Sequence, residues 1–339
     1  GFVGGRIDLI SHQLYIAQEV GNRIAPRVLL SDEVGLGKTI EAGLILHRQL
    51  ITGCASRALI LVPESLVHQW FVEMLRKFNV WVNIFDEERC TAIEKVHPDT
   101  NPFLDDQVIL TSINFLASHA KRAEQAKEAG WDLLVVDEAH HLEWSEAEPS
   151  EEYQLVDSLS RETQGLLLLT ATPEQLGQES HFARLHLLDP DRYSDLDQYK
   201  EETEQFADIA PIATALHEGM TLTTEQRKAL DAMPGLNTRM DSEILLAGLL
   251  DRHGPGRVIF RNTRAAMHDF PGRIAHLESL APDRDTKEWM THAIAEFAAD
   301  SGTGESIENF NLNYDPRIAW LGRLLHKLDE EKVLLICHN

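Results

Sequence analysis

The fold of this chain is decided by one short stretch, which reads Asp32-Glu33-Val34-Gly35-Leu36-Gly37-Lys38-Thr39. It follows an apolar run at 28–30 and precedes a run of helical character at 40–49. A strand, a glycine-containing loop and a helix in this order are typical of proteins that bind phosphate groups. The stretch therefore predicts a phosphate-binding turn between a strand and a helix.

Four residues of this stretch carry the predicted chemistry. Gly35 and Gly37 allow the backbone to turn its N–H groups toward phosphate oxygens. Lys38 would reach the β- and γ-phosphates as a point charge, and Thr39 would place its hydroxyl on Mg²⁺. The helix that begins near Lys38 directs the positive end of its dipole toward the same anion.

The match to the general phosphate-loop pattern is incomplete at one position. That pattern, G-x-x-x-x-G-K-[ST], requires glycine where this chain has Asp32, so only the core G-x-G-K-T is present. A tight turn between strand and helix that binds nothing would leave the same trace in a sequence. The rest of the chain has to decide between these two interpretations.

The composition is that of a globular protein with a strong acidic bias. Of the 339 residues, 43% are hydrophobic and 25% are charged, and the formal net charge is −24. This charge argues against a protein that coats DNA with its whole surface, because phosphates repel an acidic face. We therefore expect any contact with nucleic acid along a local basic track. No apolar run is long enough to span a membrane, and no membrane partner is expected.

The cysteines and the chain ends carry less information. Cys54, Cys90 and Cys337 lie far apart and form no C-x-x-C pair, so neither a zinc knuckle nor a disulfide framework is expected. Such cysteine usage fits a reducing cytoplasm. The chain begins with Gly1 rather than methionine and ends at Asn339 inside an apolar run, which favours a piece of a longer protein.

Apolar strands and amphipathic helices alternate along the first half of the chain. Besides the strand before the loop, we expect strands at 57–63, 80–85, 107–111, 131–136 and 165–169. We expect helices at 12–24, 65–78, 112–130 and 151–163, with a surface connection at 86–106. The residues of chemical interest all follow a strand. This alternation predicts an α/β fold, a doubly wound parallel sheet with its ligand at the carboxyl edge.

The pattern changes after residue 190. Residues 191–252 are predicted to be helical, a short strand is expected at 257–260, and a further helix is expected at 283–300. A helix at 316–328 and a buried strand at 332–337 are typical of the start of a second α/β unit. We therefore predict three parts: a first lobe at 1–190, a helical insert returning to it at 191–264, and a linker with the truncated beginning of a second lobe at 265–339.

A pair of carboxylates forms the second motif. Asp137 and Glu138 close the apolar strand that ends at Val136. A carboxylate at this place can hold Mg²⁺ opposite Thr39, and Glu138 can orient and deprotonate a water for attack on the γ-phosphate. An acidic turn at a strand end is common, but its occurrence together with the Gly-Lys-Thr loop favours the catalytic interpretation.

The third motif is a pair of hydroxyls at the end of the next strand. Thr170 and Thr172 flank Ala171 and are followed by Pro173. Two hydroxyls in such a turn could sense the γ-phosphate and pass its presence onward. Alone this motif is weak. It supports the prediction because it is the third polar motif at a strand end, after the phosphate loop and the carboxylate pair.

The series of motifs resembles that of the superfamily 2 helicase-like ATPases. The residues that carry the resemblance are Asp32 to Thr39, Leu59-Ile60-Leu61-Val62-Pro63, Asp137-Glu138-Ala139-His140 and Thr170-Ala171-Thr172-Pro173. The D-E-x-G-L-G-K-T form of the loop is similar to the SWI/SNF branch of DNA-translocating remodellers, in which aspartate is usual at position 32. The segment 179–190 and Arg261-Asn262-Thr263-Arg264 are similar to further elements of that branch.

The resemblance implies a RecA-like ATP-binding lobe and a role for each matching residue. ATP and Mg²⁺ are the implied cofactors. Gln13 would contact the adenine, and the nucleotide would be held by Gln13, Asp32, Glu33, Val34, Gly35, Leu36, Gly37, Lys38 and Thr39. Lys38, Asp137 and Glu138 would be catalytic, Thr39 and Asp137 would serve Mg²⁺, and Thr170 and Thr172 would couple two lobes. The DEAH box would be Asp137, Glu138, Ala139 and His140. Pro63 and Ser112 fall where this family touches the nucleic-acid backbone, although both can be ordinary strand-end residues.

Three stretches point to a particular group within the branch. Residues 137–145, 172–177 and 251–254 resemble the bacterial members that associate with RNA polymerase. This resemblance implies an ATP-driven motor on duplex DNA, or on RNA, that releases stalled RNA polymerase for reuse. It also implies a monomer bound to the polymerase in the bacterial cytoplasm, on the nucleoid.

Other activities share these motifs and stay open. A strand-separating helicase or a restriction-system translocase would carry the same ATP site. A polymerase-binding module could use ATP only to stabilise its shape, and a metabolic kinase shares the phosphate loop but not the two later motifs. The family also places arginines of its second lobe on the γ-phosphate, and we expect those beyond Asn339. A fragment without them would bind ATP weakly and hydrolyse it slowly.

Overall fold

The structure is a computed structural model that describes part of the chain in detail. The described residues are 10–33, 35–171, 177–217, 220, 222–231, 245, 258–262, 276–280, 291, 293–298, 315–328, 333 and 335. The chain divides into two compact units, Gly1–Phe270 and Pro271–Asn339, and each is considered by itself. The predicted loop residue Val34 and the predicted coupling residue Thr172 lie outside the described residues.

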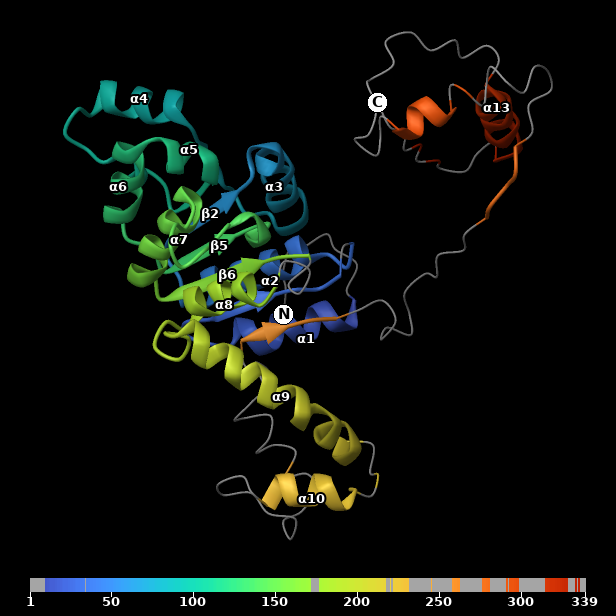
Figure 1. The fold of residues 1–339 in the computed structure, drawn as a ribbon. Coiled ribbons are helices and arrows are strands. Elements are labelled where there is room, and N and C mark those ends of the chain that lie inside the picture. Colours follow the sequence, from blue (N-terminus) through green and yellow to red (C-terminus); the bar gives the residue numbers. More distant parts are fainter. Residues whose placement is uncertain are drawn as a thin grey trace. The chain divides into compact units, whose positions relative to one another are not determined.

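The first unit is built on a parallel sheet of seven strands, in the order β3-β4-β2-β5-β6-β1-β7 (Figure 1). The strands are β1 (Arg27–Leu30), β2 (Ala58–Val62), β3 (Asn83–Phe85), β4 (Val108–Ser112), β5 (Leu133–Val136), β6 (Gly165–Leu169) and β7 (Ile259–Phe260). Every residue of β2, β4, β5 and β6 is buried, as expected for strands covered by helices on both faces. The predicted doubly wound α/β fold is confirmed.

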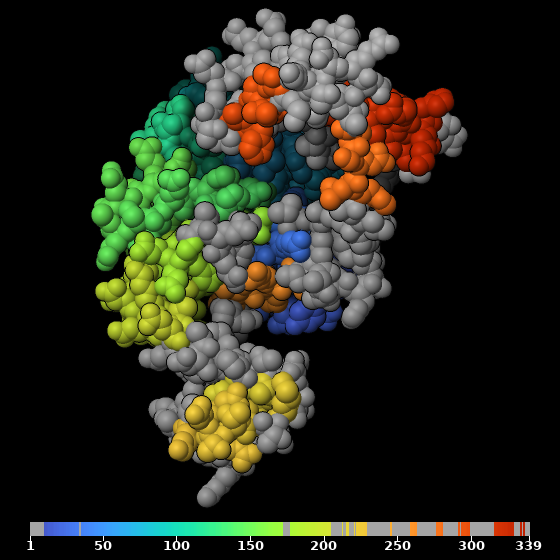
Figure 2. All heavy atoms as spheres, turned by 45° about the vertical axis from the view of Figure 1, so that its right-hand side comes forward, coloured from blue at the N-terminus to red at the C-terminus, as the bar shows by residue number. Residues whose placement is uncertain are grey.

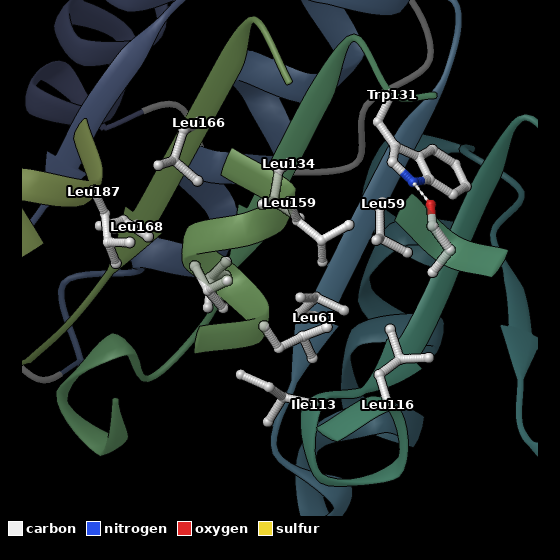
Figure 3. Packing of buried hydrophobic residues seen from close by; sticks show 14 of the residues in the cluster. Leu59, Leu61, Ile113, Leu116, Trp131, Leu134, Leu159, Leu166, Leu168 and Leu187 are labelled. Atoms are coloured by element: carbon white, nitrogen blue, oxygen red, sulfur yellow. Dashed lines mark hydrogen bonds between the residues drawn. The ribbon is translucent and has the colours of Figure 1, made fainter. Parts of the chain in front are cut away.

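Successive side chains of each strand point to opposite faces, and each face has its own helices. Leu59, Leu134 and Leu168 pack on one face (Figure 3), beneath α5 (Ile113–Ser118), α6 (Ala120–Glu128), α7 (Glu151–Glu162) and α8 (Gly177–Leu188). The opposite face packs against α1 (Ser11–Gly21), α2 (Lys38–Thr52) and α3 (Val67–Glu73). Each fully buried leucine stabilises the fold by about 1.5–3 kcal/mol relative to exposure. Burial of leucines on both faces therefore stabilises the sheet between its two helix layers.

The segment 86–106 differs from the expectation. Instead of a surface connection it contains a helix, α4 (Glu87–Val96), whose first turn is capped by Asp86 accepting from the N–H of Arg89 at 2.8 Å. Arg122 of α6 binds Glu87 and Glu94 of this helix at 2.7 Å each. The polar sequence thus belongs to an ion-paired helix, and its cation lies 35 and 28 positions away, where no local pattern shows it.

The helix predicted at 65–78 is assembled from three pieces. A 3₁₀ turn at Glu64–Leu66 leads into α3, and a π-turn follows at Met74–Phe78. Pro63 occupies the cap position of this first turn, and no side chain caps it. Phe78 packs on Gly43 of α2, where an added Cβ would lie 2.3 Å from the ring. The close approach of α2 to this turn therefore depends on glycine.

Beyond α8 the first unit continues with α9 (Leu196–His217) and α10 (Thr224–Asp231), and β7 then pairs with β1. In the second unit α13 (Pro316–Leu328) agrees with the predicted helix. Val333 and Leu335 lie outside any strand and are 42% and 55% exposed, so a buried strand at 332–337 is wrong for these two residues. An apolar run is buried only where a neighbouring element covers it. The predicted domain boundaries stay a prediction.

The described helices were also compared with the requirements of the bilayer. In the parts of the chain that the structure describes, none combines the length and the hydropathy that crossing a membrane requires.

Candidate nucleotide-binding site

Four neighbouring strands bring the predicted motifs to one edge of the sheet. In the order β5, β6, β1 and β7, their carboxyl ends lead into Asp137, Thr170, Ser31 and Arg261. All strands are parallel, so these ends lie on the same side of the sheet. The phosphate loop that follows β1 therefore lies between the end of β6 and the end of β7.

The loop has the conformation that its glycines permit. Gly35 and Gly37 have φ angles of 84° and 92°, a region that other residues rarely adopt. A Cβ at Gly37 would also lie 2.4 Å from the side-chain nitrogen of Gln13. Gly37 is the residue before α2, so the first N–H groups of that helix have no side-chain cap and can face an anion.

Gln13 lies behind this loop rather than in open space. Its side chain is buried, and its Nε2 donates to the carbonyl oxygen of Leu36 at 2.8 Å. His12 Nε2 lies 3.3 Å from the same oxygen. These contacts show that Gln13 supports the loop, while its predicted contact with the adenine stays a prediction.

Lys38 contacts the beginning of the loop. Its Nζ donates to the carbonyl oxygen of Asp32 at 2.9 Å. Lys38 and Thr39 are both partly exposed, so an incoming anion can reach them. A phosphate would compete with the Asp32 carbonyl for the ammonium group, and a charged acceptor forms the stronger hydrogen bond.

Asp32, which stands where the general pattern has glycine, has a defined structural partner. Its carboxylate is fully buried and accepts hydrogen bonds from Asn262, which follows β7. The N–H of Glu33 donates in return to the carbonyl oxygen of Asn262 at 3.1 Å. The side chain of Asp32 thus joins the loop to β7, which a glycine could not do.

A buried cluster lies beneath the loop. His12 Nε2 is 3.8 Å from Asp32 Oδ2 and 3.5 Å from Glu41 Oε1, and ligand atoms of all three residues lie within 4.8 Å of one another. Burial, and then the nearby charge of Asp32, raise the pKa of Glu41 to about 9. Glu41 therefore keeps its proton at neutral pH. Its protonated carboxyl faces Asp32, with which it shares a side-chain hydrogen bond.

Asp137 is held by two donors. The indole Nε1 of Trp70 donates to its Oδ2 at 2.7 Å, and the N–H of Glu138 donates to its Oδ1 at 2.8 Å. Burial raises the pKa of Asp137, whereas both hydrogen bonds and the nearby charge of Lys38 lower it. Burial is the largest of these causes, and the charge of Glu138 adds to it, so the pKa of Asp137 stays above its ordinary value.

The rest of the DEAH box forms a short turn. Glu138 adopts the left-handed conformation, with a φ of 49°, before the 3₁₀ turn at Ala139–His141. Its Oε2 lies 3.0 Å from Nδ1 of His140. Burial lowers the pKa of His140, and the neighbouring His141 lowers it further. A non-glycine residue in this conformation is strained, which is common at functional sites.

Arg184 of α8 supports this turn from below. It is buried, and its Nε donates to the carbonyl oxygen of Ala139 at 3.1 Å. Its Nη1 donates to Ser180 Oγ at 2.7 Å, and burial lowers its pKa to about 10. Its Nη2 has no hydrogen-bond partner among the residues that the structure describes. The buried guanidinium of Arg184 therefore places a positive charge next to the backbone that follows Asp137 and Glu138.

Of the two predicted coupling residues, Thr170 lies within the described part of the chain. Thr170 is fully buried, and its N–H donates to the carbonyl oxygen of Leu30, next to the phosphate loop. In the described part of the chain its hydroxyl has no hydrogen-bond partner.

Ser112, expected near the nucleic-acid backbone, is buried and caps α5 by accepting from the N–H of Phe115. This cap accounts for the serine, so its nucleic-acid role stays a prediction.

The residues present fit a magnesium nucleotide. A carboxylate and a hydroxyl, from Asp137 and Thr39, are the oxygen ligands that Mg²⁺ prefers, and Asp137 is oriented by its two donors. Gly35 and Gly37 hold the loop in a left-handed conformation, and at Gly37 the packing of Gln13 leaves no room for a Cβ. These observations favour a phosphate site over an empty turn.

Sequence reasoning missed Trp70, Glu41 and Arg184. A lone arginine in the apolar stretch Phe182–Leu185 is a visible signal, because an unpaired charge on a core face is unusual. Glu41 is a similar signal in α2, whose following residues Ala42–Leu46 are buried. Trp70 gives no such signal, since its distance to Asp137 along the chain is 67 positions.

Fold and site together define a RecA-like nucleotide-binding lobe. Residues 21–307 match the family model of the SNF2-related domain, and the chain belongs to that family. This confirms the resemblance to the SWI/SNF branch.

Similar proteins narrow the relationship further. The chain is 48% identical to the RNA polymerase-associated protein RapA of Photobacterium profundum and 55% identical to that of Vibrio campbellii. Each alignment covers 99% of this chain and 38% of the relative, so the chain spans well under half the length of these curated proteins. The predicted similarity to polymerase-associated members is confirmed.

Solved structures support the same fold at greater distance. The SWI2/SNF2 ATPase core of Sulfolobus solfataricus matches with a TM-score of 0.53 and 19% identity, over 97% of this chain and 58% of that one. The same core in complex with dsDNA matches with a TM-score of 0.54 and 18% identity, over 80% of this chain and 48% of that one. At this identity the likeness shows the fold.

Proposed function

We propose that this chain is the ATP-binding lobe of an SWI/SNF-type translocase that hydrolyses ATP, moves on duplex DNA and acts with RNA polymerase. The observation that carries the proposal is the sheet edge itself. A loop with left-handed Gly35 and Gly37 and an oriented carboxylate, Asp137, lie at the carboxyl edge of the same parallel sheet. Membership of the SNF2-related family supports ATP as the nucleotide.

We propose the following roles for the residues of this site. Lys38 leaves the Asp32 carbonyl and binds the terminal phosphates, while the N–H groups at the start of α2 bind the remaining oxygens. Thr39 and Asp137 would hold Mg²⁺, which when bound neutralises phosphate charge. Glu138 orients a water and accepts its proton, aided by the position that its left-handed backbone gives the side chain. Gln13 supports the loop from behind and contacts the adenine.

The partners are inferred from similar proteins. The curated relatives are named for their association with RNA polymerase, and a solved ATPase core of the same fold was captured with double-stranded DNA. We infer a monomer bound to polymerase in the bacterial cytoplasm, on the nucleoid. The net charge of −24 requires that DNA meets a local basic track rather than the general surface.

Lys38→Ala is the first test of this function. Removing the ammonium should reduce DNA-stimulated ATP hydrolysis by the complete protein at least about a hundredfold, because the γ-phosphate loses its positive partner. The measurement is the steady-state ATPase rate with and without duplex DNA. Lys95→Ala, near the end of α4, is the control and should hydrolyse ATP at the normal rate. An unchanged rate in Lys38→Ala would contradict the proposal.

Two alternatives remain distinguishable. A helicase would displace one strand of a labelled duplex, whereas a translocase moves along it without separating strands. A polymerase-binding module with structural ATP would still release stalled polymerase when Lys38 is replaced by alanine. Normal polymerase recycling by that variant would favour the module over the motor.

A further inference from the structure

Several hydrogen bonds join the phosphate loop to Asn262, which follows β7 and lies 230 positions further along the chain than Asp32. The N–H of Asn262 donates to Asp32 Oδ1 at 2.7 Å, and its side-chain Nδ2 lies 3.1 Å from each carboxylate oxygen. The N–H of Glu33 donates back to the carbonyl oxygen of Asn262 at 3.1 Å. Asn262 therefore recognises two consecutive loop residues through both its backbone and its side chain.

The Asp32–Asn262 pair is buried at its acidic end. Asp32 is 0% exposed, so its carboxylate depends on protein donors in place of water. Asn262 provides three of these contacts, while His12 Nε2 is 3.8 Å away. The donors of Asn262 therefore fix the side chain of Asp32 together with the protonated carboxyl of Glu41. Figure 2 shows the orange atoms of residues 258–262 beside the blue atoms of the N-terminal elements.

The pair also affects the position of the Lys38 ammonium group in the absence of nucleotide. The carbonyl oxygen of Asp32 accepts the hydrogen bond from Lys38 Nζ at 2.9 Å. Asn262 holds the side chain of Asp32, and the peptide between Asp32 and Glu33 is bounded by Asn262 contacts on both sides. Movement of β7 would therefore displace the carbonyl group that positions Lys38.

We propose that Asn262 is a positioning residue for nucleotide binding. By holding Asp32 and Glu33, it fixes the entry of the phosphate loop so that Lys38 and the N–H groups of α2 face the phosphates. This inference rests on the proposed ATP-binding function. By thermodynamic linkage, bound ATP in turn stabilises the attachment of residues 258–262 to the sheet.

Asn262→Asp tests the pair directly. It removes the two side-chain donors and places a second carboxylate against Asp32, so the dissociation constant of Mg²⁺-ATP should rise about tenfold or more. The double variant Asp32→Asn with Asn262→Asp exchanges the partners and restores an amide-carboxylate contact. It should bind Mg²⁺-ATP within about threefold of the unmodified protein. Calorimetric titration of the complete protein measures both.

A matched control separates the loop contact from sheet stability. Ser31 Oγ donates to the carbonyl oxygen of Phe260 at 3.1 Å, joining the same two strand ends without touching the loop. Ser31→Ala should leave the affinity for Mg²⁺-ATP unchanged. Hydrogen exchange supplies the second measurement: ATP should slow exchange at residues 258–262 in the unmodified protein and lose this effect in Asn262→Asp.

The outcomes of these measurements separate the positioning role from the proposed function. If Asn262→Asp or the milder Asn262→Ala shows a cooperative thermal unfolding transition, and is therefore folded, but binds Mg²⁺-ATP with normal affinity, Asn262 has no positioning role. A double variant that is folded but stays as weak as Asn262→Asp also overturns the proposal. Should Asn262→Asp fail to fold, Asn262→Ala and the double variant still test the role. Failure of the unmodified protein to bind ATP would instead overturn the proposed function.

Discussion

Asp137 depends on a neighbour that its motif does not contain, Trp70, as well as on Glu138 of the motif itself. Trp70 and the N–H of Glu138 each donate to one of its oxygens, so its orientation is fixed before any ion arrives. A partner that orients a metal ligand commonly changes metal affinity by about 10- to 100-fold when it is removed. The indole of Trp70 is therefore part of the proposed magnesium site.

Trp70→Phe should raise the Mg²⁺ concentration needed for half-maximal ATP hydrolysis by about tenfold. The ring still fills its place in the core, but Asp137 loses one donor and its fixed orientation. A Mg²⁺ titration of the ATPase rate measures the change. Trp131→Phe is the matched control, because its indole donates to Ala126, as the dashed line in Figure 3 shows. An equal shift in both variants would point to general loosening instead.

At the scale of elements, α4 is attached to α6 by charge, through Arg122. Arg122 is buried between Glu87 and Glu94 and lowers the pKa of each to about 2, mainly through its hydrogen bonds. The folded state thus favours both ionised carboxylates. Their ion pairs contribute stability above pH 4.5, the ordinary pKa, and this contribution is lost as the pH falls toward 2.

Arg122→Met should lower the free energy of unfolding at pH 7 by on the order of 1 kcal/mol. The figure is small because the side chain of Glu87 is 48% exposed and solvent screens its charge. The difference from the unmodified protein should shrink as the pH falls from about 5 to 3. Urea denaturation at several pH values measures it, with Lys95→Met, an exposed lysine near the end of α4, as control. A difference that does not depend on pH would contradict the ion-pair explanation.

At the scale of the first unit, Arg27 connects β1 to two helices that are distant from it in sequence. It begins β1, and its guanidinium donates to carbonyl oxygens after α7 and at the end of α8, those of Thr163, Leu187 and Leu188. Burial lowers its pKa, which Asp189 partly offsets. One side chain thereby satisfies the ends of two helices that pack on the same face of the sheet.

Arg27→Met should destabilise the unit by about 2–4 kcal/mol, because several partly buried carbonyl groups lose their donor at once. Thermal or urea unfolding monitored by circular dichroism measures the loss. Arg161→Met, an exposed arginine of α7 paired with Asp157, should change stability by less than about 0.5 kcal/mol. Comparable losses in both variants would exclude the proposed joining role of Arg27.

The sequence predicted the elements whose signal is local. The buried strand 165–169 appears with the predicted bounds, and β2 and β5 lie within the predicted ranges, because continuous apolar runs are typical of parallel strands. The helix α4 escaped prediction because its stabilising arginine is distant. The buried strand expected at 332–337 fails at Val333 and Leu335, since hydropathy alone does not show whether a neighbour covers the chain.

The sequence by itself determined the α/β class, the order of the motifs and the family to which the chain belongs. Local residue types suffice for these, because the glycine loop after an apolar strand and the acidic strand end are each formed by adjacent residues. Only the tertiary structure decided which groups support those motifs. Asp32 turns toward Asn262, Trp70 donates to Asp137, and Arg184 lies beneath Ala139. Such contacts depend on how separate strands and helices pack, and a sequence pattern does not contain those distances.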